Sequence, residues 1–429
     1  MNAQLIQSSV SKKINDFLHG NKVKTTQRQP SRAETRVLQI SKFYRPVSGG
    51  IESVVSEITE GLVDEQINTT VLCTNINGET LVENQRYKII RSGIFGKVLS
   101  TPISTDLIWQ LIKRRKDFDI IHVHLPNPIA NLGLFIANPS AKIIVHWHSD
   151  IVKQKRALKL YAPLQNWLLK RADAIIATTE PYANSSNWLK PFSEKVKVIP
   201  IGIKDPSINN TQTDESLAIQ SIKNRYGNRR IIFSLGRMIY YKGFENLIDA
   251  ATNLPDDSCV VIGGTGELFE SLQQRIIQKG LKDKVYLVGR ISEQEMSAYY
   301  KAADLFCLPS ILRSEAFGVV LLEAMAYSLP IVTTNILGSG VPWVNQHNKT
   351  GINVEPNNTE ELAEAINYLL NNKEVAKSMG YAAKKRFESE FKASDMVNRV
   401  IDLYDTISKN KKTVDMPIYT FPKQAKFIQ

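Results

Sequence analysis

Short apolar runs alternate with helix-length segments along the first half of the chain. The run at 37–40 enters a loop that contains Gly49 and Gly50, and a helical pattern follows over about 51–62. Further apolar runs of strand length follow at 69–73, 119–123, 142–147, 174–178 and 196–199. Because buried parallel strands are continuous apolar runs separated by crossover helices, this alternation predicts a parallel, doubly wound α/β sheet.

The second half of the chain repeats the alternation. Its predicted strands lie at 231–235, 259–263, 284–288, 304–308 and 330–334. Ser292 and Glu295 stand in capping-box spacing at the start of one intervening helix. Since 429 residues exceed what a single hydrophobic core usually organises, the chain is expected to form two similar domains.

Changes in pattern set the expected domain boundaries. A polar stretch without periodicity follows Pro200 and indicates a linker, and the pattern after 358 is mostly helical. The expected parts are a basic N-terminal extension (1–35), an N-terminal doubly wound domain (36–205), a linker (206–228), a C-terminal doubly wound domain (229–392), a C-terminal helix (393–410) and a basic tail (411–429).

The composition agrees with an ordinary globular protein, with 43% hydrophobic and 22% charged residues. Cys73, Cys259 and Cys307 lie in or beside apolar runs without paired or metal-ligand spacing, which indicates buried thiols in a reducing compartment. No stretch approaches the ~20 apolar residues of a membrane span, and the first residues lack the apolar core of a secretory signal. A cytoplasmic protein is therefore expected.

The formal net charge of +12 is concentrated at the two ends of the chain. Residues 1–35 hold six Lys and Arg against two acidic residues, and residues 409–429 hold five against one. With most of the excess in the tails and no recognised binding module, nucleic acid is not an expected partner. Residues 151–171 carry six basic and no acidic residues together with Tyr161, Trp167 and several leucines, a mixture that suits an anionic membrane surface.

Ligands of doubly wound sheets bind at the carboxyl ends of the strands, so the residues after each strand carry the candidate chemistry. The strand at 231–235 runs into GRMIYYKG, which places Arg237 and Lys242 where two cations can clamp a diphosphate. A solvated basic loop is the plain alternative. The next strand ends in GGTGE, where Gly264 and Gly266 free the backbone to approach a ligand.

The segment after the strand at 304–308 gives the most specific pattern. Backbone amides around Phe317, Gly318 and Val319 open a helix and can receive a phosphate. Glu315 would face a sugar hydroxyl, and Glu323, about two helical turns deeper, would accept hydrogen bonds from ribose hydroxyls. Alternatively, both are ordinary helix residues, but Glu323 lies in the apolar run LLEAMA, where a carboxylate without a partner is costly.

Four of the six histidines, His122, His124, His146 and His148, lie near the ends of two predicted strands. Spacing of two puts each pair on one strand face. Two such pairs could bind zinc, or they could be hydrogen-bonded core residues, and the second interpretation is favoured. The D-F-D at 117–119 precedes a strand rather than following one, so it is interpreted as a turn.

Taken together, these strings resemble the large retaining glycosyltransferase family 4 over about residues 36–408. They are GGIE (49–52), HVH (122–124), HWHSD (146–150), SLGRMIYYKG (234–243), GGTGE (263–267) and SEAFGVVLLEAMA (314–326). The resemblance implies the GT-B fold, in which two Rossmann-like domains face each other across a cleft. It further implies that the N-terminal domain takes the acceptor, that the C-terminal domain binds the nucleotide sugar, and that the last helix crosses back to the N-terminal domain.

The resemblance also implies roles for residues at matching positions. Arg237 and Lys242 would bind the diphosphate and Glu315 the donor sugar. Glu323 would bind the ribose and His148 would be the active-site histidine. The predicted donor site thus comprises Gly49, Gly50, Arg237, Lys242, Gly264, Gly266, Glu315, Phe317, Gly318, Val319 and Glu323, with His148, Glu315, Arg237 and Lys242 as the catalytic set. The loop between Arg237 and Lys242 lacks an acidic residue that some members carry.

Relatives with a string like GSGVPWVN (338–345) tend to use mannose or rhamnose in surface polysaccharides. The expected donor is GDP-mannose, then a dTDP- or UDP-sugar, and the expected acceptor is a lipid-linked saccharide at the inner face of the plasma membrane. No metal and no cofactor is expected. Spacing alone nominates no carboxylate nucleophile, so front-face displacement is the working hypothesis. A nucleotide-sugar epimerase or a phosphorylase of the same fold is the alternative.

Overall fold

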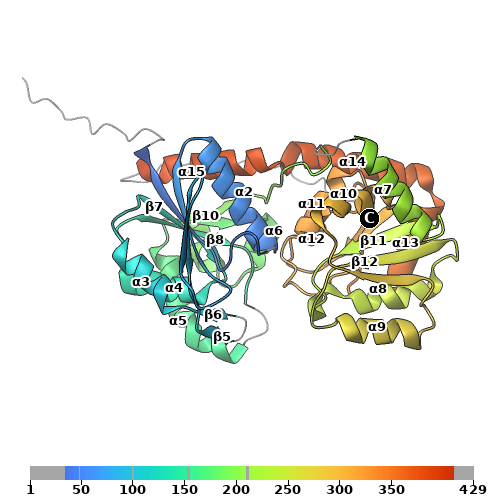
Figure 1. Ribbon diagram of the computed structural model, residues 1–429, viewed down its shortest axis with the longest axis horizontal. Helices are drawn as coiled ribbons and strands as arrows, with labels where there is room; N and C mark the ends of the chain where they lie inside the picture. The colour runs from blue at the N-terminus through green and yellow to red at the C-terminus, as the bar shows by residue number, and fades with distance from the viewer. Residues whose placement is uncertain (1–33, 48, 99–100, 152–154, 209–211, 410–429) are drawn as a thin grey trace, which may run out of the picture.

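The computed structural model describes residues 34–47, 49–98, 101–151, 155–208 and 212–409. The predicted basic tail and nearly all of the predicted N-terminal extension lie outside the described residues. Two α/β domains lie side by side, and a long helical segment runs along both of them (Figure 1). The two-domain, doubly wound architecture predicted from the alternation of apolar runs is confirmed.

The N-terminal domain is built on an eight-stranded sheet in the order β10-β9-β8-β7-β1-β2-β4-β3. Neighbouring strands are parallel except β3, which is antiparallel to β4. The strands are β1 (Arg36–Ile40), β2 (Asn68–Thr74), β3 (Leu81–Asn84), β4 (Lys88–Ser92), β7 (Ile120–Leu125), β8 (Lys142–Trp147), β9 (Ala174–Ala177) and β10 (Val196–Val198), and β5 (Gly96–Val98) pairs separately with β6 (Thr101–Ile103). The helices are α2 (Gly50–Asp64), α3 (Thr105–Lys113), α4 (Pro128–Ala137), α5 (Lys155–Arg171) and α6 (Glu180–Ser185), with a 3-10 helix at Lys190–Lys195.

Helices cover both faces of this sheet because its central strands are buried on both sides. Buried residues of α3, α4 and α5 pack against Leu38 and Ile40 of β1 on one face. On the other face, Val54 and Ile58 of α2 pack with residues of the last helix against Val37. The apolar runs of the sequence are therefore buried parallel strands, as predicted.

The C-terminal domain has a six-stranded, fully parallel sheet in the order β13-β12-β11-β14-β15-β16. The strands are β11 (Arg230–Leu235), β12 (Ser258–Gly263), β13 (Val285–Gly289), β14 (Leu305–Leu308), β15 (Ile331–Thr334) and β16 (Gly351–Val354). The helices are α7 (Gln212–Arg225), α8 (Phe244–Ala250), α9 (Phe269–Gln278), α10 (Glu293–Ala302), α11 (Val319–Ala326), α12 (Val341–Val344), α13 (Thr359–Asn371), α14 (Lys373–Glu390) and α15 (Ala393–Lys409), with short 3-10 helices at Tyr240–Lys242 and Ala251–Asn253. Ser292 caps α10 by accepting from the backbone N–H of Glu295, as its spacing predicted.

The segment 206–228 differs from the irregular linker that its polar sequence indicated. It contains α7, which packs against α10, and Ile222 and Tyr226 are buried in the core of the C-terminal domain. The expectation of an irregular linker was wrong over these residues because a helix that contributes so few buried side chains has a weak apolar period.

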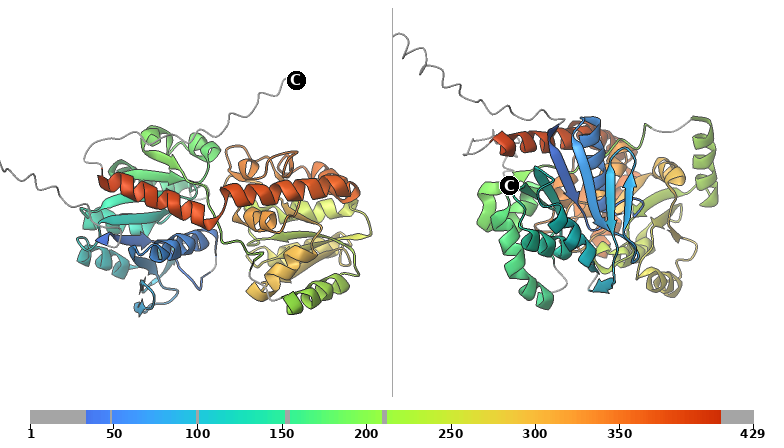
Figure 2. Two further views of the ribbon diagram at one scale, coloured as in Figure 1. Left: turned by 90° about the horizontal axis from the view of Figure 1, so that it is seen from above. Right: turned by 60° about the vertical axis from the view of Figure 1, so that its left-hand side comes forward.

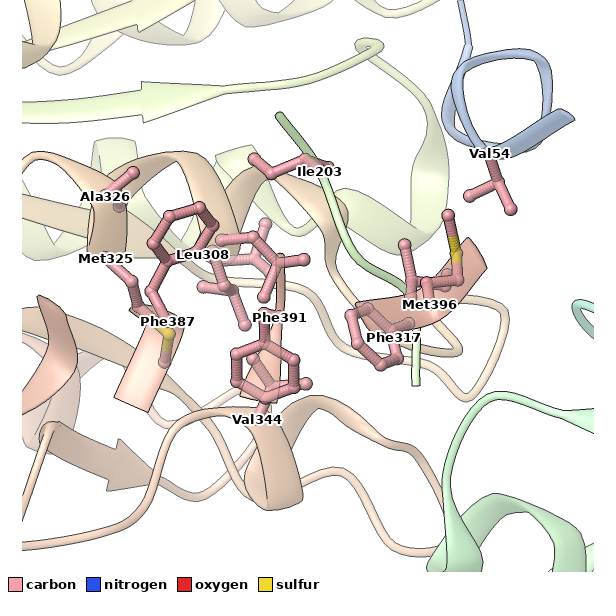
Figure 3. Close-up of a cluster of buried hydrophobic side chains, with 14 of the residues drawn as sticks. Val54, Ile203, Leu308, Phe317, Met325, Ala326, Val344, Phe387, Phe391 and Met396 are labelled. Carbon is pink, nitrogen blue, oxygen red and sulfur yellow. The ribbon is translucent and has the colours of Figure 1, made fainter. Parts of the chain in front are cut away.

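Two short segments pair where the chain passes between the domains. Ile203 donates its backbone N–H to the carbonyl of Phe391 at 2.9 Å and accepts from Ala393 at 2.9 Å. Before this point α14 lies on the C-terminal domain, and after it α15 lies against α2 of the N-terminal domain (Figure 2). Phe391 shares a buried cluster with Phe317 and Met396, so an apolar core continues through the junction (Figure 3).

Candidate active site

In each sheet the direction of the strand order reverses between two central strands, and the loops that follow these two strands carry the predicted site residues. In the C-terminal domain the reversal lies between β11 and β14, which lead to Arg237 and Glu315. In the N-terminal domain it lies between β1 and β7, which end near Gln39 and His124. Crevices at such reversals are the usual ligand sites of doubly wound sheets.

Lys242 and Glu315 form a buried ion pair at the C-terminal reversal. The ammonium nitrogen of Lys242 lies 2.6 Å from Oε2 of Glu315, and each side chain is only about one-tenth exposed. Ser310 donates its hydroxyl to the same carboxylate oxygen at 3.1 Å. The sequence placed both charged residues in the donor site, and the structure brings them into direct contact.

Gly236 and Gly243 explain how the loop after β11 places Lys242. A Cβ added at Gly236 would lie 3.1 Å from Cε of Lys242, so the lysine side chain folds back over this glycine. Gly243 has φ +65°, and a side chain there would collide with the carbonyl of Pro309. Arg237, five positions before Lys242, is exposed and available to a ligand.

The glycines of GGTGE hold two loops together. Gly264 has φ +123°, and a Cβ there would collide with the carbonyl of Gly236. A Cβ at Gly266 would collide with the backbone of Met238, whose N–H donates to Thr265 at 2.9 Å. In the described contacts these glycines allow a close approach between their own loop and the loop after β11. Their contact with a donor stays a prediction.

The start of α11 has the geometry expected of a phosphate-binding helix end. Gly318 caps the helix with φ +79°, and no side chain occupies the capping position. The backbone around Phe317 to Val319 therefore turns sharply into the helix, with Phe317 buried beneath it. Unsatisfied amides and the helix dipole favour an anion at such an end.

Glu323 is held by a partner that the sequence did not indicate. The hydroxyl of Tyr300, on α10, donates to Oε2 of Glu323 at 2.6 Å. Burial raises the pKa of the Glu323 carboxyl, and the Tyr300 hydrogen bond and the charge of Lys242 oppose that rise. The carboxylate is therefore a satisfied member of the C-terminal site rather than an exposed helix residue. Its contact with a ribose stays a prediction.

The glycine loop of the N-terminal domain faces the start of α11. A Cβ at Gly50 would lie 3.7 Å from Cγ2 of Val319, in ordinary contact across the two domains. Gly49 is the residue that caps α2. The two predicted halves of the site therefore meet.

Charges from both domains also interact at this boundary. Burial raises the pKa of Glu52, and the positive charges of Lys42 and Arg237 lower it. Burial lowers the pKa of Lys42, and Glu52 opposes that effect. Glu52 belongs to the GGIE string, but Lys42 was missed, and only its position just after β1 could have drawn attention to it.

A second ionic contact joins the domains beside His148. Arg313 donates from Nη1 to Oδ2 of Asp150 at 2.6 Å and from Nε to the carbonyl of Gly338 at 2.9 Å. Trp147 and Ser186 hold the other oxygen of Asp150. Arg313 lies two residues before Glu315 and was missed, because its partners are far away in the sequence.

The four histidines form one buried column at the ends of β7 and β8. Neighbouring rings are near-parallel, with centroids 4.2 Å apart for His146 and His148 and 4.5 Å apart for His122 and His124. Burial lowers the pKa of His122 and of His148 to about 3, and lowers those of His124 and His146 well below the usual value. The imidazoles are therefore neutral at neutral pH.

A metal site remains the alternative use of this column. One nitrogen each of His122, His124 and His146 lies within 4.8 Å of the others. However, Nδ1 of His124 lies 2.9 Å from His148 and its Nε2 lies 2.9 Å from Gln39, so His124 could ligate an ion only by breaking a hydrogen bond. The D-F-D at 117–119 forms a bend between α3 and β7, just after the turn at 114–116, and Asp119 pairs with Arg36 at 3.0 Å.

A cavity of about 680 Å³ lies away from this site, beside β13. It is lined among others by Tyr226, Tyr286 and Tyr299. None of the predicted donor-site residues lines this cavity, so it is not a candidate for the donor site.

Two Rossmann-like domains that meet at their strand ends, with a cationic loop, a helix start without a side-chain cap and the carboxylates of Glu315 and Glu323 on one side, match the glycosyltransferases of the GT-B class. The sucrose-phosphate synthase of Thermosynechococcus elongatus has a similar fold, with a TM-score of 0.73, 19% identity and coverage of 87% of this chain and 99% of that one. An Anabaena protein solved with UDP-glucose gives a TM-score of 0.69 at 19% identity, covering 86% of this chain and 99% of that one.

Sequence comparison leads to the family. A model described as Glycosyltransferase Family 4 matches residues 48–205, and one described as Glycosyl transferases group 1 matches residues 216–386. The O-antigen chain mannosyltransferase C of Escherichia coli is 33% identical over 380 residues, 88% of this chain and 100% of that protein. A D-rhamnosyltransferase of Pseudomonas aeruginosa is 30% identical over 360 residues, 83% of this chain and 92% of that protein. The chain belongs to the family 4 glycosyltransferases, and the epimerase and phosphorylase alternatives gain no support.

Proposed function

We propose that this enzyme transfers a hexose, mannose or rhamnose, from a nucleotide sugar to a lipid-linked saccharide in the synthesis of a surface polysaccharide. GDP-mannose is the first candidate donor. The observation that carries the proposal is the gathering of Arg237, the buried Lys242–Glu315 pair and the open start of α11 around one strand reversal. The activities named for the two relatives at 33% and 30% identity support the choice of sugar and pathway.

In the proposed reaction the leaving group is a nucleoside diphosphate. The acceptor oxygen bonds to the anomeric carbon as the bond from that carbon to the diphosphate oxygen breaks, and the acceptor proton passes to the departing phosphate. Arg237, Lys242 and the amides around Gly318 stabilise the negative charge that develops on the departing diphosphate. Electrostatic stabilisation of this kind is usually the largest contribution of an active site to the rate. Glu315 orients the sugar, Glu323 binds the ribose, and His148 lies on the acceptor side.

A screen of nucleotide sugars for thermal stabilisation tests the donor. A donor present at a hundred times its Kd should stabilise the enzyme by about 2.7 kcal/mol, and Arg237→Met should remove most of the shift. Transfer to a lipid-linked saccharide, compared with donor hydrolysis without acceptor, then tests the reaction. If no nucleotide sugar stabilises the protein the proposal is wrong, and if only UDP- or dTDP-sugars do, the choice of GDP-mannose is wrong.

The proposed reaction uses no metal and no cofactor. Metal analysis of the purified enzyme, together with transfer rates before and after chelation, checks this. Stoichiometric zinc would contradict the expectation and direct attention to the histidine column.

We propose further that the enzyme works in the cytoplasm, bound peripherally to the inner face of the plasma membrane. Among the described residues no helix is both long and apolar enough to cross a bilayer. The packed pair α4 and α5 exposes apolar side chains, with Phe135 50%, Ile136 51% and Leu160 87% exposed, next to the exposed Lys159. An apolar face with basic neighbours suits the headgroup region of an anionic membrane.

Vesicle flotation tests the membrane proposal. Binding should require anionic lipid, weaken with salt, and fall at least tenfold in a Phe135→Ser, Ile136→Ser double variant. Tyr381→Ser, which changes an exposed aromatic residue of α14, is the matched control and should bind as the parent does. Binding that is indifferent to lipid charge and salt would remove the membrane from the proposal.

A further inference from the structure

A chain of buried hydrogen bonds leads from His148 to the last helix. Nε2 of His148 lies 2.9 Å from Nδ1 of His124, and Nε2 of His124 lies 2.9 Å from Oε1 of Gln39. The Gln39 amide nitrogen donates to the hydroxyl of Tyr404 at 3.0 Å, and that hydroxyl lies 2.7 Å from Nδ1 of His122. These residues come from β1, β7, the end of β8 and α15.

The chemistry of each partner assigns a direction to every proton. In the structure the Gln39 amide oxygen faces His124 and its nitrogen faces Tyr404. Because an amide oxygen only accepts and an amide nitrogen only donates, this orientation puts the proton of His124 on Nε2. Because a neutral imidazole has one N–H, Nδ1 of His124 is bare and must accept from Nε2–H of His148. Nδ1 of His148 is therefore bare as well. On the other side, the Tyr404 hydroxyl accepts from Gln39 and donates to Nδ1 of His122.

Burial makes the loss of any one partner in this chain of hydrogen bonds costly. Gln39, His122 and His124 are at most 1% exposed, and Tyr404 is 2% exposed, so water cannot easily substitute for a missing partner. Burial also lowers the pKa of His148 to about 3, which keeps the ring neutral and makes the tautomer, rather than the charge, the variable that matters.

We propose that Tyr404 and Gln39 are positioning residues that hold His148 in the tautomer with a bare Nδ1, ready to accept a hydrogen bond from a sugar hydroxyl. The helix that carries Tyr404 follows the C-terminal domain in the chain but packs on the N-terminal domain, so a residue near the end of the sequence helps to set the chemistry of the acceptor half. The inference rests on the proposed place of His148 in the site. No proton is transferred along the chain during the reaction.

Nitrogen NMR of histidine-labelled enzyme tests the tautomer without any substrate. The chain has six histidines, and a His148→Gln spectrum assigns the signal of interest. In the parent, the Nδ1 resonance of His148 should lie in the range of a bare imidazole nitrogen and Nε2 in the range of a protonated one. The reverse pattern at His148 would overturn the proposal, whatever the donor proves to be.

Tyr404→Phe and Gln39→Met test the two relay residues, and Tyr87→Phe is the control. Tyr87 also loses a hydroxyl bonded to another side chain of the N-terminal domain, but outside the relay. Both relay variants should give two His148 tautomers and about a tenfold lower kcat, with the donor KM changed less than twofold and stability comparable to the control. If His148 keeps a single tautomer and kcat stays at the parental level in both folded variants, Gln39 and Tyr404 only pack the core.

Discussion

Removing the ammonium of Lys242 gives the sharpest test of the predicted donor site. In Lys242→Met the Glu315 carboxylate keeps the Ser310 hydroxyl but loses its ion-pair partner at 2.6 Å. Breaking a buried pair from one side typically costs about 3–5 kcal/mol. Because the serine bond remains and each side chain is about one-tenth exposed, we expect a loss near the lower end, about 3 kcal/mol, in urea unfolding of the C-terminal domain.

The same variant should bind the donor poorly for a separate reason. A hydrogen bond from an ammonium to a phosphate contributes about 1.5–3 kcal/mol, which corresponds to a roughly ten- to hundredfold weaker Kd. Titration calorimetry with the donor measures this directly. A Lys242→Met enzyme with parental affinity would refute the assignment of Lys242 to the diphosphate.

A double variant separates the two effects. Lys242→Met with Glu315→Gln leaves two neutral side chains, and the amide can still bond to Ser310. Its stability should return to within about 1 kcal/mol of the parent, whereas donor affinity should stay low. If the double variant is no more stable than Lys242→Met alone, the ion pair is not what Lys242 contributes to the fold.

Three further predictions concern other parts of the site. Glu323→Ala should weaken donor binding about ten- to hundredfold, and Glu323→Gln, which keeps an acceptor for the Tyr300 hydroxyl, should weaken it less. Titration calorimetry with both variants measures the change, and parental affinity in both would refute the ribose assignment. Gly264→Ala should destabilise the C-terminal domain by about 2 kcal/mol or more, because a Cβ there collides with the backbone of Gly236. Gly280→Ala has open space around it and should cost only about 1 kcal/mol, for its positive φ. Urea unfolding of the two variants measures the difference. Burial lowers the pKa of His148 from 6.5 to about 3, so on acidification the unfolded chain binds the proton before the folded protein does. The contribution of His148 to the free energy of unfolding should therefore fall by about 2 kcal/mol between pH 7 and pH 5. A His148→Gln variant whose stability has the same pH dependence as the parent would contradict this.

The fold was largely predictable from the sequence because parallel strands buried on both faces are unbroken apolar runs. The same logic fails for strands that are not buried. The edge strand β3 at Leu81–Asn84 is mostly exposed, and β5 at Gly96–Val98 is exposed throughout, so neither leaves a strong apolar signal. The helix at Gln212–Arg225 was missed for a similar reason, because few of its side chains are apolar and buried in the core.

For the site, sequence found the residues that follow the strands but not the residues that hold them. Tyr300 supports Glu323 from 23 positions away, and Gln39 reaches Tyr404 across 365 positions. Contacts of this kind are created by the packing of elements, and no local pattern marks them. Motif positions are therefore easier to predict than the hydrogen bonds that make them work.

Lys242 illustrates what packing adds to a motif. In sequence terms it was the weaker of the two basic residues, because the loop before it lacks an acidic residue that some relatives carry. Its position follows instead from two glycines: Gly236 leaves space for the folded-back side chain, and Gly243 allows the turn against the Pro309 carbonyl. Glu315 then fixes the ammonium from the neighbouring strand's loop. An acid within the lysine's own loop is not needed to hold the ammonium when the counter-charge comes from the loop after β14, and the contact of Lys242 with a diphosphate stays a prediction.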